Sequence, residues 1–302
     1  MKQRFLLGLC VLASVFMTGC STDDATTNSP VTNFSEMQDV SLSFYDVSMR
    51  PIGEGMMQTR ADDKSPAFTR LDVKLLSENG SYLYRQYYSD KTPEDFGKLQ
   101  IKVPVGDYQM VAIASKYTDE DSVGIASASS VTFPSDKLTD MQQAVVPVTV
   151  KAGTTNNVSA TLKRTISKFS IICTDVIPEA AKTIKFTVTG NCGTSLNPTM
   201  GNAASEAVYQ RTILANPENK KVLTGAQYGV YLLLSSDEEK VTINVSVLDA
   251  AGNSLNSWNF TDVGMKQGYV TVYKGALFSK DTSLNFVIDT KALRESGYGK
   301  DF

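Results

Sequence analysis

The sequence predicts an all-β protein made of two β-sandwiches in tandem. Helical periodicity is nearly absent, because apolar residues do not recur at spacings of three and four. Short β-rich segments separated by turn residues follow one another through most of the chain. The pattern also divides into two similar halves, and 302 residues are enough for two domains of ordinary size.

The first 19 residues are expected to be a signal peptide. Lys2 and Arg4 precede the apolar run FLLGLCVLASVFM, which is short for a membrane span. The run ends in MTGC, which is similar to a bacterial lipobox and predicts cleavage before Cys20 and lipidation of that cysteine. An ordinary secretory signal that happens to end near a cysteine is the alternative. Residues 20–37 are polar and are expected to form a tether.

The first sandwich is expected to span residues 38–163. The segment LLSENGSYLYRQ places Asn79-Gly80 between two β-rich runs, which is a strong hairpin signal. A polar linker, residues 49–67, separates the first strand from the rest. The expected strands are 39–48, 68–77, 81–88, 98–104, 107–115, 130–133, 144–150 and 156–163.

The second sandwich is expected to span residues 164–302. Its segment VLDAAGNSLNSW repeats the strand, glycine turn and strand of the first half. The polar stretch after residue 190 is interpreted as a long insertion without strands. No long linker separates the halves, so we expect a packed interface between them. The expected strands are 165–175, 182–190, 230–236, 240–250, 254–261, 268–279 and 283–290.

Composition argues against an enzyme and against a nucleic-acid-binding protein. The chain has no histidine, which removes the commonest general base and metal ligand, although Ser-Lys or paired-carboxylate chemistry stays formally possible. Its 29 basic and 32 acidic residues give a net charge of −3, without a basic excess for nucleic acid. We therefore expect no enzymatic activity, no cofactor, no metal and no nucleic-acid partner.

Two cysteines, Cys173 and Cys192, lie in the exported part of the chain. An oxidising compartment permits a disulfide between them, with a stabilisation of about 3 kcal/mol on the loop-entropy model. Each is equally compatible with a small buried apolar residue. The sequence leaves both interpretations open.

Five segments follow the lipobox in a fixed order: DVSLSFYDVS, TRAD, VPVGDYQMVAIAS, ATLKRTISKFSI and MKQGYVTVYKGALF. They supply a strand and a TRAD loop, then a Pro-x-Gly-x-Tyr turn, a Leu-x-Arg segment and a late strand pair. In this order they are similar to segments of the fimbrillins, the subunits of Bacteroidales type V pili. The chain therefore resembles a member of the fimbrillin superfamily over nearly its whole length.

This resemblance implies two transthyretin-like, Greek-key sandwiches and assembly by strand exchange. An Arg-specific surface protease would cut at Arg60 in the linker or, as the runner-up, at Arg70 near the start of the next expected strand. The first strand, 39–48, would then leave, and a donor strand from another fimbrillin subunit would fill its place.

The same resemblance points to residues on both exchanging strands. Leu42, Phe44 and Val47 are the expected anchors of the removable strand, and the donor strand is expected near the C-terminus. That C-terminal strand has a second interpretation, as the fixed last strand of the second sandwich. The donor candidates are Leu284, Phe286 and Ile288.

The expected function is that of a structural subunit of a surface pilus, exported as a lipoprotein held in the outer membrane and supporting adhesion. One alternative is a lipid-retaining anchor or tip subunit. Another is a non-polymerising surface lipoprotein that binds glycan or host protein, for which the tyrosines of 81–88 offer aromatic contacts. A half-exposed strand pair explains those tyrosines as well.

Overall fold

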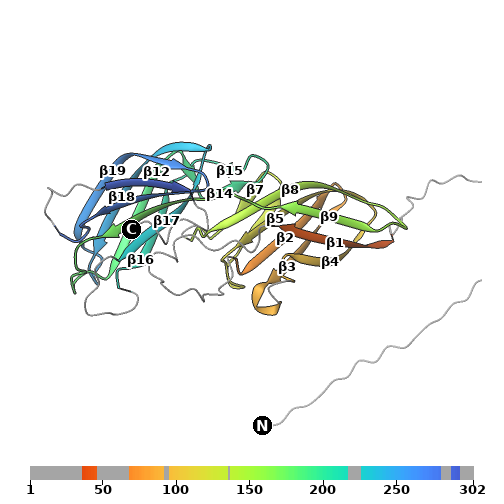
Figure 1. Ribbon diagram of the computed structural model, residues 1–302, viewed down its shortest axis with the longest axis horizontal. Coiled ribbons are helices and arrows are strands. Elements are labelled where there is room, and N and C mark those ends of the chain that lie inside the picture. Colours follow the sequence, from red (N-terminus) through yellow and green to blue (C-terminus); the bar gives the residue numbers. More distant parts are fainter. Residues whose placement is uncertain are drawn as a thin grey trace, which may run out of the picture. The chain divides into compact units, whose positions relative to one another are not determined.

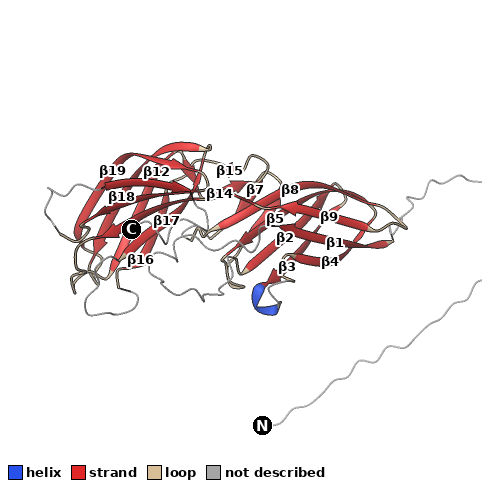
Figure 2. Ribbon diagram, in the orientation of Figure 1, coloured by secondary structure: helices blue, strands red, loops and turns tan. Residues whose placement is uncertain are grey.

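The computed structural model describes an all-β protein (Figure 2). It describes residues 36–45, 68–91, 95–134, 137–216 and 226–279, and the backbone alone of 287–292. Within these ranges the helical content is one short 3₁₀ turn, Tyr88–Asp90, and there is no α-helix. The predicted fold class is therefore confirmed at the level of an all-β chain.

Residues 37–164 supply two sheets (Figure 1). The first has three strands in the order β4 (Lys98–Pro104), β1 (Met37–Tyr45) and β9 (Asn156–Thr161). The second has five, in the order β10 (Lys163–Arg164), β8 (Met141–Val150), β5 (Gly106–Ser115), β2 (Arg70–Ser77) and β3 (Gly80–Tyr87). The predicted hairpin at Asn79-Gly80 is confirmed, since β2 and β3 pair in antiparallel register.

One apolar core lies between these two sheets. Leu42 of β1, Val103 of β4 and Ala160 of β9 belong to the same buried cluster as Val73 of β2 and Met110 of β5. Alternation along each strand explains this, because every second side chain points toward the facing sheet. The core therefore depends on β1 as well as on the five-stranded sheet.

Residues 167–292 supply two further sheets. The five-stranded one has the order β13 (Cys192–Gly193), β17 (Gln227–Leu234), β11 (Ser167–Cys173), β20 (Tyr269–Gly275) and β21 (Val287–Ala292). The four-stranded one has the order β16 (Tyr209–Leu214), β12 (Thr183–Gly190), β18 (Glu238–Leu248) and β19 (Ser254–Lys266). Strand β11 pairs parallel with β20, as β1 pairs parallel with β9.

A small sheet joins strands from both halves of the chain. Its order is β15 (Asn202–Ala203), β14 (Ser195–Asn197), β7 (Ser130–Thr132) and β6 (Gly124–Ser127). Leu196 of β14 pairs with Val131 of β7, and both are fully buried. The halves are thus hydrogen-bonded to one another, as the absence of a long linker predicts.

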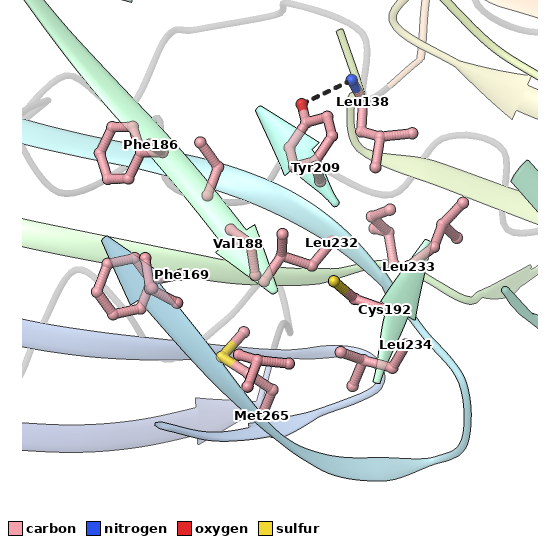
Figure 3. Close-up of a cluster of buried hydrophobic side chains, with 14 of the residues drawn as sticks. Leu138, Phe169, Phe186, Val188, Cys192, Tyr209, Leu232, Leu233, Leu234 and Met265 are labelled. Carbon is pink, nitrogen blue, oxygen red and sulfur yellow. Dashed lines mark hydrogen bonds between the residues drawn. The ribbon is translucent and has the colours of Figure 1, made fainter. Parts of the chain in front are cut away.

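The core of the second half extends into this junction. Figure 3 shows Phe169, Phe186 and Leu232 packed in one cluster, which also contains Ile113 of β5. At its border the Leu138 N–H donates to the Tyr209 hydroxyl at 3.1 Å (Figure 3). Burying a tyrosine hydroxyl requires such a partner, which ties the turn before β8 to β16.

The stretch after residue 190 differs from its interpretation as a strandless insertion. It contains β13, β14, β15 and β16, and β16 pairs with β12 along its whole length. The interpretation was wrong because three of these strands have only two or three residues, too few to show alternation. Strand β16 lies at a sheet edge. Its outward residues, such as Gln210 and Thr212, are polar and alternate with Tyr209 and Ile213, so the segment has few apolar residues in the sequence.

Candidate functional site: the first strand and its slot

Strand β1 fits its sheet through alternating side chains. Val40, Leu42 and Phe44 are buried in the core, whereas Ser41 and Ser43 are half-exposed on the opposite face. This is the period of two expected for a strand with one covered face. Two predicted anchors, Leu42 and Phe44, therefore lie in the core of the folded protein.

The third predicted anchor, Val47, lies outside the described residues. Val40, which the sequence analysis did not single out, is fully buried one repeat before Leu42. The alternating letters VSLSF carry the signal that would have found it.

β1 is bound along both edges. On one side it pairs antiparallel with β4, from Met37 opposite Pro104 to Ser43 opposite Lys98. On the other side it pairs parallel with β9, from Val40 opposite Asn156 to Tyr45 opposite Thr161. We call the space that β1 fills between β4 and β9 the β1 slot. Without β1, the slot would expose two rows of backbone N–H and C=O groups and an apolar floor.

Further hydrogen bonds hold the C-terminal end of β1. The Phe44 N–H donates to the Gly97 carbonyl at 2.8 Å, and the Leu162 N–H donates to the Tyr45 carbonyl at 3.2 Å. Side chains add contacts across the sheet, since the Ser41 hydroxyl donates to the Gln100 amide oxygen at 2.9 Å. The strand is thus fastened by its backbone, by its core side chains and by its outer face.

The described chain resumes at Phe68, just before β2. Phe68 is fully buried. The Thr69 N–H donates to the Ser115 carbonyl, and the Thr69 carbonyl accepts from the Tyr88 N–H, both at 2.9 Å. The linker position Arg60 lies outside the described residues, so its cleavage stays a prediction.

Arg70, the runner-up cleavage site, is fully buried in a network of ion pairs. Its guanidinium donates to both carboxylate oxygens of Asp72, at 2.8 and 3.0 Å, and to the carbonyls of Thr118 and Asp121, at 2.7 and 2.8 Å. Arg85 also reaches Asp72, at 2.6 Å. A protease needs an accessible, locally unfolded segment. Because Arg70 is buried and hydrogen-bonded, the folded protein presents no such segment at this position.

The two buried cysteines are free thiols, which corrects the disulfide interpretation. They flank β17 on opposite sides and at opposite ends: the Cys173 N–H bonds to the Ala226 carbonyl, whereas Cys192 pairs with Leu234. Eight residues of strand separate these contacts, a distance of about 26 Å. A disulfide requires Cα atoms within about 7 Å. The alternative, two small buried residues in one core, is the correct description.

The C-terminal strand β21 forms the edge of its sheet and pairs antiparallel with β20. Of the predicted donor residues, Ile288 lies in β21 opposite Tyr273. Leu284 and Phe286 lie outside the described residues. Whether this strand is donated to another subunit stays a prediction.

The tyrosines of β3 are used mainly inside the fold. The Tyr84 hydroxyl donates to the Lys102 carbonyl at 2.8 Å, and Tyr82 packs edge-on against Tyr108 with ring centroids 6.1 Å apart. Burial raises the pKa of the Tyr84 hydroxyl, with a smaller contribution from neighbouring Tyr82. These contacts favour the packing explanation for them.

The described residues provide no cluster of three acidic, cysteine or histidine side chains that could hold a metal ion. In the same part of the chain, no helix is long and apolar enough to cross a bilayer. The β1 slot is the candidate site whose geometry is described most fully, by pairing on both edges and by core contacts.

The comparison with known families identifies the chain. Residues 27–288 match the family described as "Fimbrillin-A associated anchor proteins Mfa1 and Mfa2". The chain belongs to this family. Mfa2-family proteins are fimbria-associated cell-surface anchor proteins rather than enzymes, in agreement with the composition.

Several solved structures are similar to this chain. The fimbrial anchor protein Mfa2 from Porphyromonas gingivalis is 13% identical, with a TM-score of 0.41 over 86% of this chain and 99% of that one. A fimbrial assembly protein from Parabacteroides distasonis is 14% identical, with a TM-score of 0.42 over 85% and 99%. A candidate adhesin from Bacteroides ovatus is 10% identical, with a TM-score of 0.47 over 82% and 88%. No curated protein matches the chain.

Proposed function

We propose that this protein is a lipid-retaining anchor that holds a fimbrium to the outer membrane. Membership of the anchor family carries the proposal. The lipobox supports it, because acylation of Cys20 would attach the chain to the membrane at its N-terminus. The partner is a fimbrial subunit of the same bacterium.

The geometry of β1 supports retention of this strand. The lipid on Cys20 connects to the folded body through β1, so an anchor has to keep β1 in its slot. The strand is hydrogen-bonded on both edges and contributes Val40, Leu42 and Phe44 to the core. Extracting it would expose both edges and this apolar surface, which is unfavourable unless another strand takes its place.

The polymerising subunit is the second candidate. It requires a cut at Arg60, departure of β1 and entry of a donor strand into the slot. The central position of β1 is compatible with this, because the vacated slot would accept a strand on both sides. The anchor-family match favours the retained strand over the released one.

We also propose that the chain folds as two sandwich domains, 38–163 and 164–302. The two core clusters and the repeated parallel pairs β1–β9 and β11–β20 support this division. The small sheet β15-β14-β7-β6 and the ion pair of Arg164 with Asp140, at 2.9 Å, would then hold the domains together.

Mass spectrometry of the protein purified from the native cell surface tests the anchor proposal. We expect an N-terminus at acylated Cys20 and an intact peptide bond after Arg60. An N-terminus at Ala61 in assembled fibres would contradict the anchor role and support the polymerising subunit.

Two variants sharpen this test. Cys20→Ala should release the protein and its fimbriae into the medium, because the acyl chains are lost while the fold is unchanged. Arg60→Ala should leave fimbriae attached to cells, since an anchor does not depend on the cut. Loss of fimbriae in Arg60→Ala would identify the cut as essential and overturn the proposal.

A further inference from the structure

Figure 1 labels the strands of the four-stranded sheet β16-β12-β18-β19. Its solvent face is nearly uncharged in the two rows described below. Its inward side chains, such as Phe186 and Val245, are fully buried in the core. The outward ones are half-exposed or exposed, and Lys185 is the one charged residue among the two rows described next. We call eight of these outward side chains the polar face: Gln210, Thr187, Asn244, Asn259, Thr212, Lys185, Ser246 and Ser257. The adjoining row, Leu214, Thr183, Leu248 and Ser254, contains two leucines and is not part of it.

The register places the polar face in two rows across the strands. One row runs through Gln210, Thr187, Asn244 and Asn259, each directly opposite the next. The other runs through Thr212, Lys185, Ser246 and Ser257 in the same way. Neighbouring side chains in a row are about 4.8 Å apart, the spacing of paired strands.

Hydrogen bonds within the face hold part of it in place. The Ser246 hydroxyl donates to the Asn244 amide oxygen at 3.0 Å, and the Asn244 amide donates to the Ser257 hydroxyl at 3.3 Å. Each group retains capacity for a further donor or acceptor on its solvent side. A ligand that binds here would meet partly ordered side chains and lose less entropy in ordering them.

The chemistry of the face favours a neutral, hydroxyl-rich ligand. Hydroxyl and amide groups both donate and accept, which matches the hydroxyls of a sugar. An anionic ligand would find only Lys185 as a counter-charge. Protein interfaces enrich aromatic residues, methionine and arginine at their centres, and neither row contains any of these. A protein partner therefore fits this face less well than a saccharide.

The distance between paired strands and a neighbouring hollow favour an extended ligand chain that crosses the strands. One sugar residue of an extended, β-linked polysaccharide is close in length to the distance between paired strands, so each strand would present a side chain to each sugar. Beyond the rows, β18 and β19 border an open hollow of about 670 Å³, lined by Asn191, Gly264, Met265 and the charged residues Glu238, Glu239, Lys240 and Lys266. The position of a side chain on Gly264 is empty space, so the hollow has room for the end or a branch of the chain.

We propose that the polar face binds an extended, uncharged polysaccharide that crosses the four strands. Binding would attach the protein to a polysaccharide independently of the proposed membrane anchor. The inference does not rest on the anchor function, because it concerns a different sheet and needs no lipid.

Titration of the soluble exported chain, carrying Cys20→Ser, with a β-1,4-linked glucomannan and a xylan tests this inference. We expect binding to at least one of these neutral polysaccharides and none to the anionic polygalacturonate. Absence of binding to both neutral chains, or a preference for polygalacturonate, would overturn the proposal. Neither result would bear on membrane retention, which the Cys20→Ala experiment measures separately.

Isosteric variants locate the binding. Thr187→Val and Thr212→Val each remove a hydroxyl and keep the β-branched shape, so the sheet should fold unchanged. Each is expected to weaken binding about fivefold, the effect of one lost hydrogen bond. The matched control is Thr161→Val, on the exposed face of β9. If the control weakens binding as much as the two face variants, the site lies elsewhere and the proposal fails.

Discussion

Leu42 of β1 lies directly opposite Leu99 of β4, and both side chains are buried in the same core. The parallel neighbour on the other side of Leu42 is Val158 of β9. Leu42 thus lies at the centre of β1 between β4 and β9. A substitution at this position should therefore change how stably β1 is held in the sheet.

Leu42→Ala should therefore destabilise the protein and loosen β1. Removing a buried leucine side chain costs about 2–5 kcal/mol of unfolding free energy. Denaturant unfolding measures this loss, and proteolysis of β1 should become faster. Ser43→Ala, on the outer face of the same strand, is the control and should change stability little. Equal effects of the two substitutions would show that the core contacts of β1 are not what holds it.

Arg70→Leu should cost about 3–5 kcal/mol of unfolding free energy, the range for breaking a buried ion pair. The substitution leaves Asp72 buried with Arg85 alone and removes both donors to the loop carbonyls of Thr118 and Asp121. Arg85→Leu is the comparison, because the Arg85 side chain is 37% exposed and should matter less. Calorimetric unfolding of both variants gives the ranking, and the reverse order would refute this account of the network.

Cys173 and Cys192 should not react with a thiol reagent in the folded protein at pH 8. Burial raises the pKa of Cys192 to about 11 and also raises that of Cys173, so neither forms the reactive thiolate. Both should react after denaturation without a reductant. Peptide mapping that finds a disulfide between them would contradict the structure.

The raised pKa of Cys192 also predicts a loss of stability in alkali. In the unfolded chain this thiol has a pKa of about 8.5, so folding is favoured below that value. The contribution disappears as the pH rises toward about 11. Urea unfolding between pH 8 and 11 should therefore show a smaller decline in Cys192→Ala than in the parent chain, and an equal decline would exclude this thiol as a cause.

Acid should weaken the loop held by Asp121 and Lys137. Burial raises the pKa of the Asp121 carboxyl, but hydrogen bonds from Lys137, at 2.8 Å, and from Thr118 outweigh it and hold the pKa below its usual value. Stability from this pair is present above the usual pKa of about 3.9 and is lost as the pH falls through the folded value.

Asp121→Asn tests this linkage by urea unfolding at pH 6 and pH 3. The variant should be less stable than the parent at pH 6 and should lose less stability on acidification. Glu120→Gln, an exposed neighbour, should follow the parent at both pH values. A parent-like decline in Asp121→Asn would place the acid sensitivity in other carboxyl groups.

Most long strands could be predicted from the sequence. The stretch Lys98–Pro104 matches its expectation residue for residue, because Leu99, Ile101 and Val103 alternate with polar residues. The strands around Cys192 and β6 (Gly124–Ser127) were missed, since two to four residues are too few to carry a period. Their existence depends on partners that are distant in the chain, such as β17 for β13.

The candidate site was predicted in part. Leu42 and Phe44 could be assigned to a buried face from alternation, whereas the order β4-β1-β9 could not, because β9 lies more than a hundred residues along the chain. Arg70 was a plausible cleavage site in the sequence, because nothing local shows that its guanidinium is buried against Asp72.

The sequence by itself determined the all-β class, the two hairpins with glycine turns and the family resemblance, because these depend on local periodicity and short motifs. The tertiary structure decided which strands are neighbours. It placed β1 between two partners, the cysteines at opposite ends of β17, and the polar residues of four strands in two rows. Register and long-range pairing follow from the packing of the whole core, which no local pattern specifies.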